Sequence, residues 1–204
     1  MNNKKVLIIV LAIIALLGCF IAIRVITKKG EKNMGKVNVE ISVKNYGIIE
    51  LELDGDVAPI TVENFVNLVN DGFYNGLTFH RIISGFMIQG GDPNGNGTGG
   101  SNKKIKGEFS KNGVENNISH VRGTISMARS GGNPDTEYTM NSASSQFFIV
   151  HEDSTYLDGN YAAFGHVTSG MEVVDKIAND AQPIDRNGTI SRDKQPVIEY
   201  IKVK

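Results

Sequence analysis

The 204-residue sequence predicts a mainly β fold, a closed β-barrel capped by two α-helices, with one N-terminal transmembrane helix in front of it. Three observations predict this arrangement. Many short apolar runs are separated by Gly, Asn and Asp, which is typical of short strands joined by turns. Only two stretches have the spacing of an amphipathic helix, and such an excess of strands favours a barrel. One uncharged apolar run, Val6 to Ile23, precedes them all.

The N-terminal apolar run predicts a membrane anchor. It has 18 residues and follows Lys4 and Lys5. A helix needs about 17–25 apolar residues to cross a bilayer. A cleavable signal peptide has a shorter apolar region of about 7–15 residues and ends in a small-residue cleavage site, which is missing here. We therefore expect residues 1–26 to form a single-pass membrane anchor or an uncleaved signal sequence.

Processing and orientation of this segment each have an alternative. Leu16-Leu17-Gly18-Cys19 resembles a bacterial lipoprotein site with Cys19 as the lipidated residue, although the residues that follow stay apolar. More Lys and Arg follow the run than precede it, which favours a cytoplasmic C-terminal side. A very short N-terminal tail with lysines is nevertheless the common form of an exported anchor. We expect an extracytoplasmic domain at the cell membrane and keep lipidation as the alternative.

The elements of the domain can be placed in order. Residues 27–36 are polar and basic and form a linker, and the domain covers 37–204. Thr61 is the expected N-cap of the first helix, which continues to Gly72. The second helix is expected over 171–178. The remaining runs predict strands, which alternate or are continuously apolar: 37–43, 48–53, 78–82, 86–89, 123–128, 146–151, 162–166 and 196–203.

Composition and motifs exclude several classes of function. The whole chain has 21 Lys+Arg against 22 Asp+Glu, which gives no reason to expect nucleic acid as a partner. Cys19 is the only cysteine, and the four histidines lack metal-ligand spacing, so we expect no disulfide, metal or other cofactor. Gly95-x-Gly97-x-x-Gly100 matches a dinucleotide fingerprint in spacing, but no strand–helix context surrounds it. No Gly-x-Ser-x-Gly elbow of a serine hydrolase occurs.

Four segments of the domain carry a resemblance to a known family. They are Phe79-His80-Arg81-Ile82-Ile83-Ser84-Gly85-Phe86-Met87-Ile88-Gln89, Gly123 to Arg129, Ser145 to Val150, and Tyr156 to Gly159. In this order, from about Val37 to Val203, they resemble the cyclophilins, which are peptidyl-prolyl cis–trans isomerases. The resemblance implies an eight-stranded antiparallel barrel with two capping helices. It also implies catalysed rotation about X–Pro bonds of polypeptides, which assists protein folding and needs no cofactor.

The resemblance also implies a role for each site residue. Arg81 would be the catalytic arginine. Gln89 and the main chain of Arg129 would hydrogen-bond the substrate backbone, Gln146 would support the groove, and Ala128 would lie beside the residue that precedes proline. The pocket for the proline ring would be lined by four apolar side chains: Phe86, Met87, Phe148 and Leu157.

Two positions depart from the best-known eukaryotic members of the family. A tryptophan is replaced by Tyr156, and a histidine at the pocket edge by Tyr161, both of which we expect to contact substrate. The tryptophan is associated in the family with tight binding of cyclosporin, so weak sensitivity to that drug is expected. The expected partners are proline-containing polypeptides, bound by a monomer. The alternative function is a non-catalytic module that binds proline-containing segments, or a chaperone, at the membrane. Such a module would be free to lose Arg81.

Overall fold

A computed structural model describes residues 34–132 and 135–204 of the chain. The predicted anchor, Cys19 and most of the predicted linker lie outside the described residues. In the described part, no helix combines the length and the apolar character needed to cross a bilayer.

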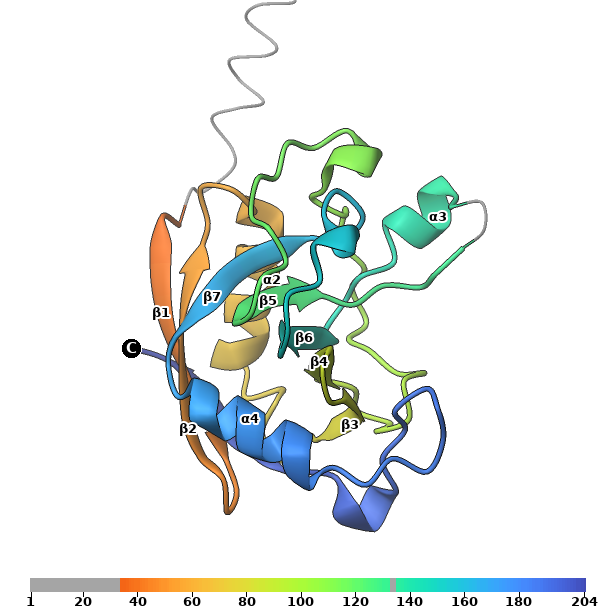
Figure 1. Ribbon diagram of the computed structural model, residues 1–204. Coiled ribbons are helices and arrows are strands. Elements are labelled where there is room, and N and C mark those ends of the chain that lie inside the picture. Colours follow the sequence, from red (N-terminus) through yellow and green to blue (C-terminus); the bar gives the residue numbers. More distant parts are fainter. Residues whose placement is uncertain (1–33, 133–134) are drawn as a thin grey trace, which may run out of the picture. The chain divides into compact units, whose positions relative to one another are not determined.

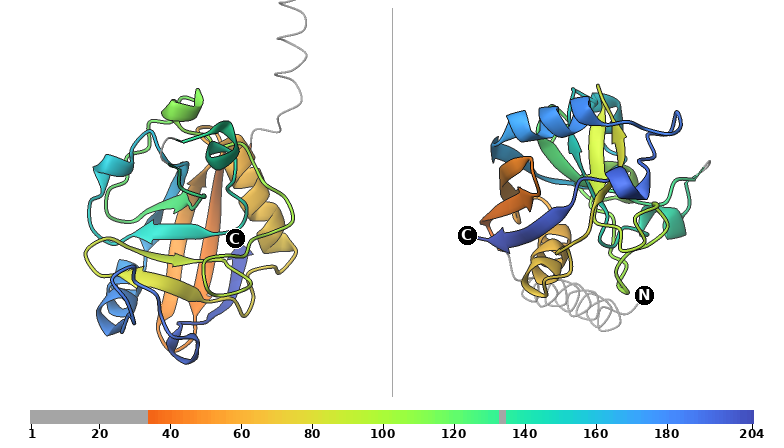
Figure 2. Two further views of the ribbon diagram at one scale, coloured as in Figure 1. Left: turned by 90° about the vertical axis from the view of Figure 1, so that its right-hand side faces the viewer. Right: turned by 90° about the horizontal axis from the view of Figure 1, so that it is seen from below.

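Eight antiparallel strands form the sheet, in the order β3-β4-β6-β5-β7-β2-β1-β8 (Figures 1 and 2). All eight predicted strands are present, and a mainly β fold is confirmed. Their alternating or continuously apolar sequences bury one or both faces, which is why they pair side by side. The strand bounds are β1 Lys36–Val43, β2 Gly47–Asp54, β3 Phe79–Ile83, β4 Met87–Gly90, β5 Thr124–Met127, β6 Phe147–Val150, β7 Ala163–Ser169 and β8 Ile198–Val203.

Closure of the barrel is less complete than predicted. The two end strands of the sheet, β3 and β8, share no ladder. The residues directly before these strands, Thr78 and Val197, form one isolated bridge, and Phe79 N donates to Pro196 O at 2.9 Å. The backbones touch only where these strands begin and then diverge. The sheet is therefore an open barrel with a single point of closure between its edges.

The two predicted helices are confirmed as α2 (Pro59–Asn70) and α4 (Met171–Asp180), at opposite sides of the sheet (Figure 2). A short third helix, α3 (Glu137–Met140), was not predicted. The prediction of Thr61 as N-cap was wrong, because the N-cap is Ala58 and Pro59 occupies the first helical position. Proline fits there because the first turn needs no N–H from it.

The first turn of α2 is instead capped by a distant carboxylate. Glu108 is 2% exposed and accepts hydrogen bonds from Ile60 N at 3.1 Å and Thr61 N at 2.8 Å. The Thr61 hydroxyl donates to the same carboxylate at 2.6 Å. A helix N-terminus favours negative charge, so a buried glutamate is suitable there.

Strand alternation divides the apolar side chains into two clusters. The main core lies inside the sheet, where Phe65 of α2 packs against the rings of Tyr74, Phe147 and Phe164. A second, smaller cluster lies on the other face of β4 and β6 and consists of Met87, Phe148, Val150 and Leu157. Successive residues of a strand point to opposite faces, so Phe147 enters the core and Phe148 the second cluster.

Candidate active site

The β3–β4 hairpin places Arg81 directly opposite Gln89. The chain turns between them, with Gly85 at φ +79°, and antiparallel pairing brings the two side chains together. Arg81 Nη1 donates to Gln89 Oε1 at 3.1 Å, and Arg81 Nε donates to Asn187 O at 2.7 Å. The guanidinium is therefore held by two oxygen acceptors, and its Nη1 also lies 3.9 Å from Met87 Sδ.

A cavity of about 190 Å³ opens beside this arginine. Its floor is the second apolar cluster, in which Met87, Phe148 and Leu157 are at most 8% exposed. The Arg81 guanidinium carbon lies 6.0 Å from the centre of the Phe86 ring. Nine residues that the resemblance singled out line this one cavity: Arg81, Phe86, Met87, Gln89, Ala128, Arg129, Phe148, Leu157 and Tyr161.

Two of the expected site residues lie outside this lining. Gln146 lines a neighbouring cavity of about 460 Å³. It accepts from Gln89 Nε2 at 2.9 Å and donates to Gly97 O at 3.1 Å and Gly99 O at 2.7 Å. Tyr156 is 67% exposed, and its ring lies 6.0 Å from that of Phe86. Gln146 thus fixes the Gln89 amide, whereas Tyr156 contacts only the outer rim of the cavity.

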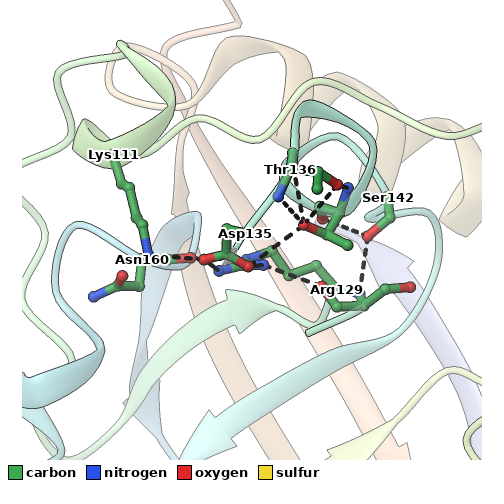
Figure 3. Close-up of polar contacts among 8 residues, drawn as sticks. Lys111, Arg129, Asp135, Thr136, Ser142 and Asn160 are labelled. Atoms are coloured by element: carbon green, nitrogen blue, oxygen red, sulfur yellow. Dashed lines mark hydrogen bonds and ion pairs between the residues drawn. The ribbon is translucent and has the colours of Figure 1, made fainter. Parts of the chain in front are cut away.

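The Arg129 side chain enters a polar cluster (Figure 3), and its guanidinium carbon lies 4.9 Å from the centre of the Tyr161 ring. Its Nη1 and Nη2 donate to the two carboxylate oxygens of Asp135 at 2.9 and 3.0 Å, and its Nε donates to Asn160 O at 2.9 Å. Lys111 Nζ lies 2.8 Å from the same carboxylate. The Arg129 guanidinium and the Lys111 ammonium hold the pKa of Asp135 well below its usual range.

This arrangement leaves the backbone of Arg129 available. The flanking N–H groups of Ala128 and Ser130 are bonded to Gln146 O and to the Ser142 hydroxyl. Among the described residues, none hydrogen-bonds to the N–H or C=O of Arg129 itself. The side-chain cluster thus holds an unpaired peptide group at the wall of the cavity.

Comparison with known proteins identifies the family of this chain. The family described as "Cyclophilin type peptidyl-prolyl cis-trans isomerase/CLD" matches residues 38–203. The chain belongs to the cyclophilin family. It is 44% identical over 149 residues to a peptidyl-prolyl cis-trans isomerase of Helicobacter pylori, covering 72% of this chain and 84% of that protein. It is 48% identical over 131 residues to peptidyl-prolyl cis-trans isomerase B of Bacillus subtilis, covering 64% and 83%.

A solved structure gives the same result. A cyclophilin type peptidyl-prolyl cis-trans isomerase of Cryptosporidium parvum, crystallised in the presence of the dipeptide Ala-Pro, superposes with a TM-score of 0.69 at 30% identity. The match covers 82% of this chain and 98% of that one. The activity of this cyclophilin is peptidyl-prolyl cis–trans isomerisation.

The cyclophilin site also includes a hydrogen-bonded relay, with a buried histidine and serine and an exposed aspartate, that sequence reasoning missed. The Nδ1 of His120 lies 2.8 Å from Asp158 Oδ1, and its Nε2 lies 3.0 Å from Ser126 Oγ. Burial lowers the pKa of His120, and Asp158 opposes this. The imidazole stacks on the Phe148 ring, with 6.0 Å between ring centres.

The order Ser–His–Asp in this relay resembles that of a hydrolase, but Ser126 is fully buried within β5 and no substrate can reach it. The relay therefore supports the floor of the cavity and offers no nucleophile. Asp158 lies 38 residues from His120, so no local sequence pattern indicates their contact.

Proposed function

We propose that Arg81 is the catalytic residue of this isomerase and that the adjacent apolar cavity binds the proline ring. The observation that carries this proposal is the cavity itself, in which a half-buried guanidinium stands over a floor of apolar side chains. A proline ring is small, apolar and rigid, so a shallow apolar cavity suits it. Ala-Pro, the dipeptide present with the Cryptosporidium relative, is a ligand of this kind.

The chemistry needs only a pocket and a well-placed donor. An X–Pro bond rotates slowly because amide conjugation imposes a barrier of about 18–20 kcal/mol. In the twisted state the prolyl nitrogen becomes pyramidal and its lone pair accepts a hydrogen bond. Arg81 supplies donors for that nitrogen and stays protonated at working pH, although burial lowers its pKa. Donors that bind the twisted state better than either planar isomer accelerate the rotation.

The other groups position the substrate. In this proposal Phe86, Met87, Phe148 and Leu157 hold the ring, and Tyr161 closes the edge. Gln89 and the peptide group of Arg129 bind the substrate backbone, Ala128 lies beside the residue before proline, and Tyr156 extends the rim. The physical support is the unpaired peptide group of Arg129 and the Gln89 amide, whose orientation is fixed by Arg81 and Gln146.

The proposal is tested by substituting the arginine. Removing one preorganised donor from an active site costs about 10²–10³ in rate. We expect Arg81→Ala to lower kcat/KM for an Ala-Pro peptide, followed by NMR exchange spectroscopy, by at least about hundredfold. Arg192→Ala removes an exposed arginine outside the cavity and serves as the control. A folded Arg81→Ala variant with near-normal exchange rates would refute the catalytic role of Arg81, whereas a wild-type chain that binds the peptide without accelerating its exchange would favour the non-catalytic proline-binding module.

We further propose that the domain acts as a monomer, anchored to the cell membrane by residues 1–26 and joined to the anchor by residues 27–36. The support for the anchor is the 18-residue apolar run after two lysines. We place the domain outside the cytoplasm, where it would assist folding of exported polypeptides. A reporter that is active only outside the cytoplasm, fused after Lys204, tests this. We expect the reporter to be active. An inactive reporter on a chain that associates with the membrane would indicate that the domain faces the cytoplasm. Radiolabelled fatty acid incorporated at Cys19 would favour the lipoprotein alternative.

A further inference from the structure

The segment that follows α4 covers the outer edge of β3, next to the catalytic arginine. Thr189 forms an isolated bridge with Arg81, and Ile82 N donates to Gly188 O at 2.8 Å. Ile190 N donates in turn to His80 O at 2.9 Å. In Figure 1 this segment is the blue loop that runs past β3. The turn formed by residues 185–189 thus pairs with β3 on the side opposite to β4.

One exposed carboxylate organises this turn. Asp185 Oδ1 accepts hydrogen bonds from Asn187 N at 2.9 Å and from Thr189 N at 3.0 Å. The bonds from Thr189 and Asn187 lower the pKa of Asp185, so the carboxylate is ionised at neutral pH. Asp often closes a turn in this way, by accepting from backbone N–H groups further along the chain.

The turn also needs glycine at one position. Gly188 has φ +86°, and a Cβ there would lie 2.5 Å from Ile83 Cγ1 and 2.7 Å from Ile82 O. Glycine is the residue that adopts this conformation and tolerates this contact. The path of the turn over β3 is therefore set by Asp185 on one side and Gly188 on the other.

The turn also contacts the guanidinium of Arg81. The Asn187 carbonyl, presented by this turn, accepts from Nε, while Gln89 accepts from Nη1. A guanidinium is planar, so fixing two of its nitrogens fixes its plane. Among the described residues, Nη2 donates to no group, which leaves it for the substrate.

We propose that Asp185 is a positioning residue of the isomerase, which holds the Asn187 carbonyl on Arg81 Nε and so sets the plane of the catalytic guanidinium. This rests on the catalytic role proposed for Arg81. The Asn187 carbonyl makes the direct contact with Arg81, and the Asp185 carboxylate bonds to backbone N–H groups and also attracts the Arg81 charge from a distance. Asparagine at position 185 keeps an acceptor oxygen and removes the charge, so it separates geometry from charge.

The test compares Asp185→Ala and Asp185→Asn in the wild-type chain and in the Arg81→Ala variant. Because the Asn187 carbonyl stays in the chain, Asp185→Ala weakens its bond to the guanidinium without removing the acceptor, and we expect this to correspond to about three- to tenfold in rate. We expect Asp185→Ala to lower kcat by that factor with KM within about twofold, and Asp185→Asn to stay within about twofold of wild type. In the Arg81→Ala background, Asp185→Ala is expected to have almost no further effect, because residues that act as one unit are not additive. Asp193→Ala is the matched control, since Asp193 is an exposed carboxylate in the 3₁₀ helix Arg192–Lys194 that, among the described residues, bonds to Ser191 and to its own backbone.

A second readout is independent of turnover. The Nε–H proton of Arg81 should exchange slowly with solvent in the wild-type chain and in Asp185→Asn, and faster in Asp185→Ala. Wild-type activity in Asp185→Ala, an equal loss in both backgrounds, or unchanged Nε–H exchange would each overturn the proposal. An Asp185→Asn variant as slow as Asp185→Ala would overturn its geometric basis. Normal turnover in Arg81→Ala alone would instead refute the role of Arg81, which is a different failure.

Discussion

Replacing Gln89 by alanine tests how the catalytic guanidinium is held. The substitution removes the acceptor that lies 3.1 Å from Arg81 Nη1 and the donor that lies 2.9 Å from Gln146 Oε1. Hydrogen bonds to charged groups contribute about 1.5–3 kcal/mol. Arg81 keeps its bond to the Asn187 carbonyl and is half-buried, so water can replace part of the loss. We therefore expect the lower end of that range, which is about a tenfold decrease in kcat/KM.

Gln89→Glu sharpens the same prediction. It keeps an acceptor for Arg81 but places two acceptor oxygens face to face where Gln89 Nε2 now donates to Gln146. Rotating the Gln146 amide would break its bonds to the Gly97 and Gly99 carbonyls. The added negative charge would also draw the guanidinium away from the substrate. We expect a larger loss than in Gln89→Ala.

The assay is NMR exchange spectroscopy on an Ala-Pro peptide, with thermal unfolding measured on each variant. Gln182→Ala, an exposed glutamine that pairs with Lys194, is the matched control. The reasoning would be refuted by exchange rates within twofold of wild type in Gln89→Ala. It would also be refuted by faster exchange in Gln89→Glu than in Gln89→Ala.

Three further outcomes are expected. Glu108→Ala leaves the first turn of α2 without its acceptor and should lower the free energy of unfolding by about 3 kcal/mol, which is roughly 6–12 °C in thermal midpoint. The control Glu115→Ala, at an exposed glutamate, should change the midpoint little. Equal midpoints of the two variants would contradict the capping role of Glu108. The depressed pKa of Asp135 means that its folded-state stabilisation is complete above about pH 4, the unfolded value, and is lost as pH falls below it. The thermal midpoint should therefore fall less steeply below pH 4 in Asp135→Asn, and an unchanged acid slope would argue against the cluster. Cyclosporin should inhibit weakly because Tyr156 replaces a tryptophan, and Tyr156→Trp should strengthen inhibition; potent inhibition of the wild-type chain would sink this idea.

The strands could be predicted because their signal is local. Alternation in 37–43 and the continuous apolar run of 147–150 follow directly from which faces are buried, and both strands are present. Barrel closure could not be predicted in the same way. It depends on how far β3 and β8 run side by side, and their backbones diverge after the Thr78–Val197 bridge.

The remaining differences come from contacts between residues far apart in the sequence. Thr61 is a reasonable N-cap by local rules, but the helix begins earlier, and Glu108 accepts from the N–H of Thr61 from 47 residues away. The side chain of Arg129 points to Asp135 and leaves its peptide group at the cavity, which no local pattern indicates. Asn187 acts through its carbonyl, a group that every residue has, so its identity gave no signal.

The central claim is that Arg81 stabilises the twisted amide while the apolar cavity binds the proline ring. It is tested most directly by comparing peptide affinity with exchange rate in Arg81→Ala. An Ala-Pro peptide titrated into ¹⁵N-labelled wild-type and variant chains gives Kd, and exchange spectroscopy on the same samples gives the rate. The account predicts that Kd changes by less than about threefold while the rate falls at least about hundredfold. Equal losses in affinity and rate, or a preserved rate, would contradict it.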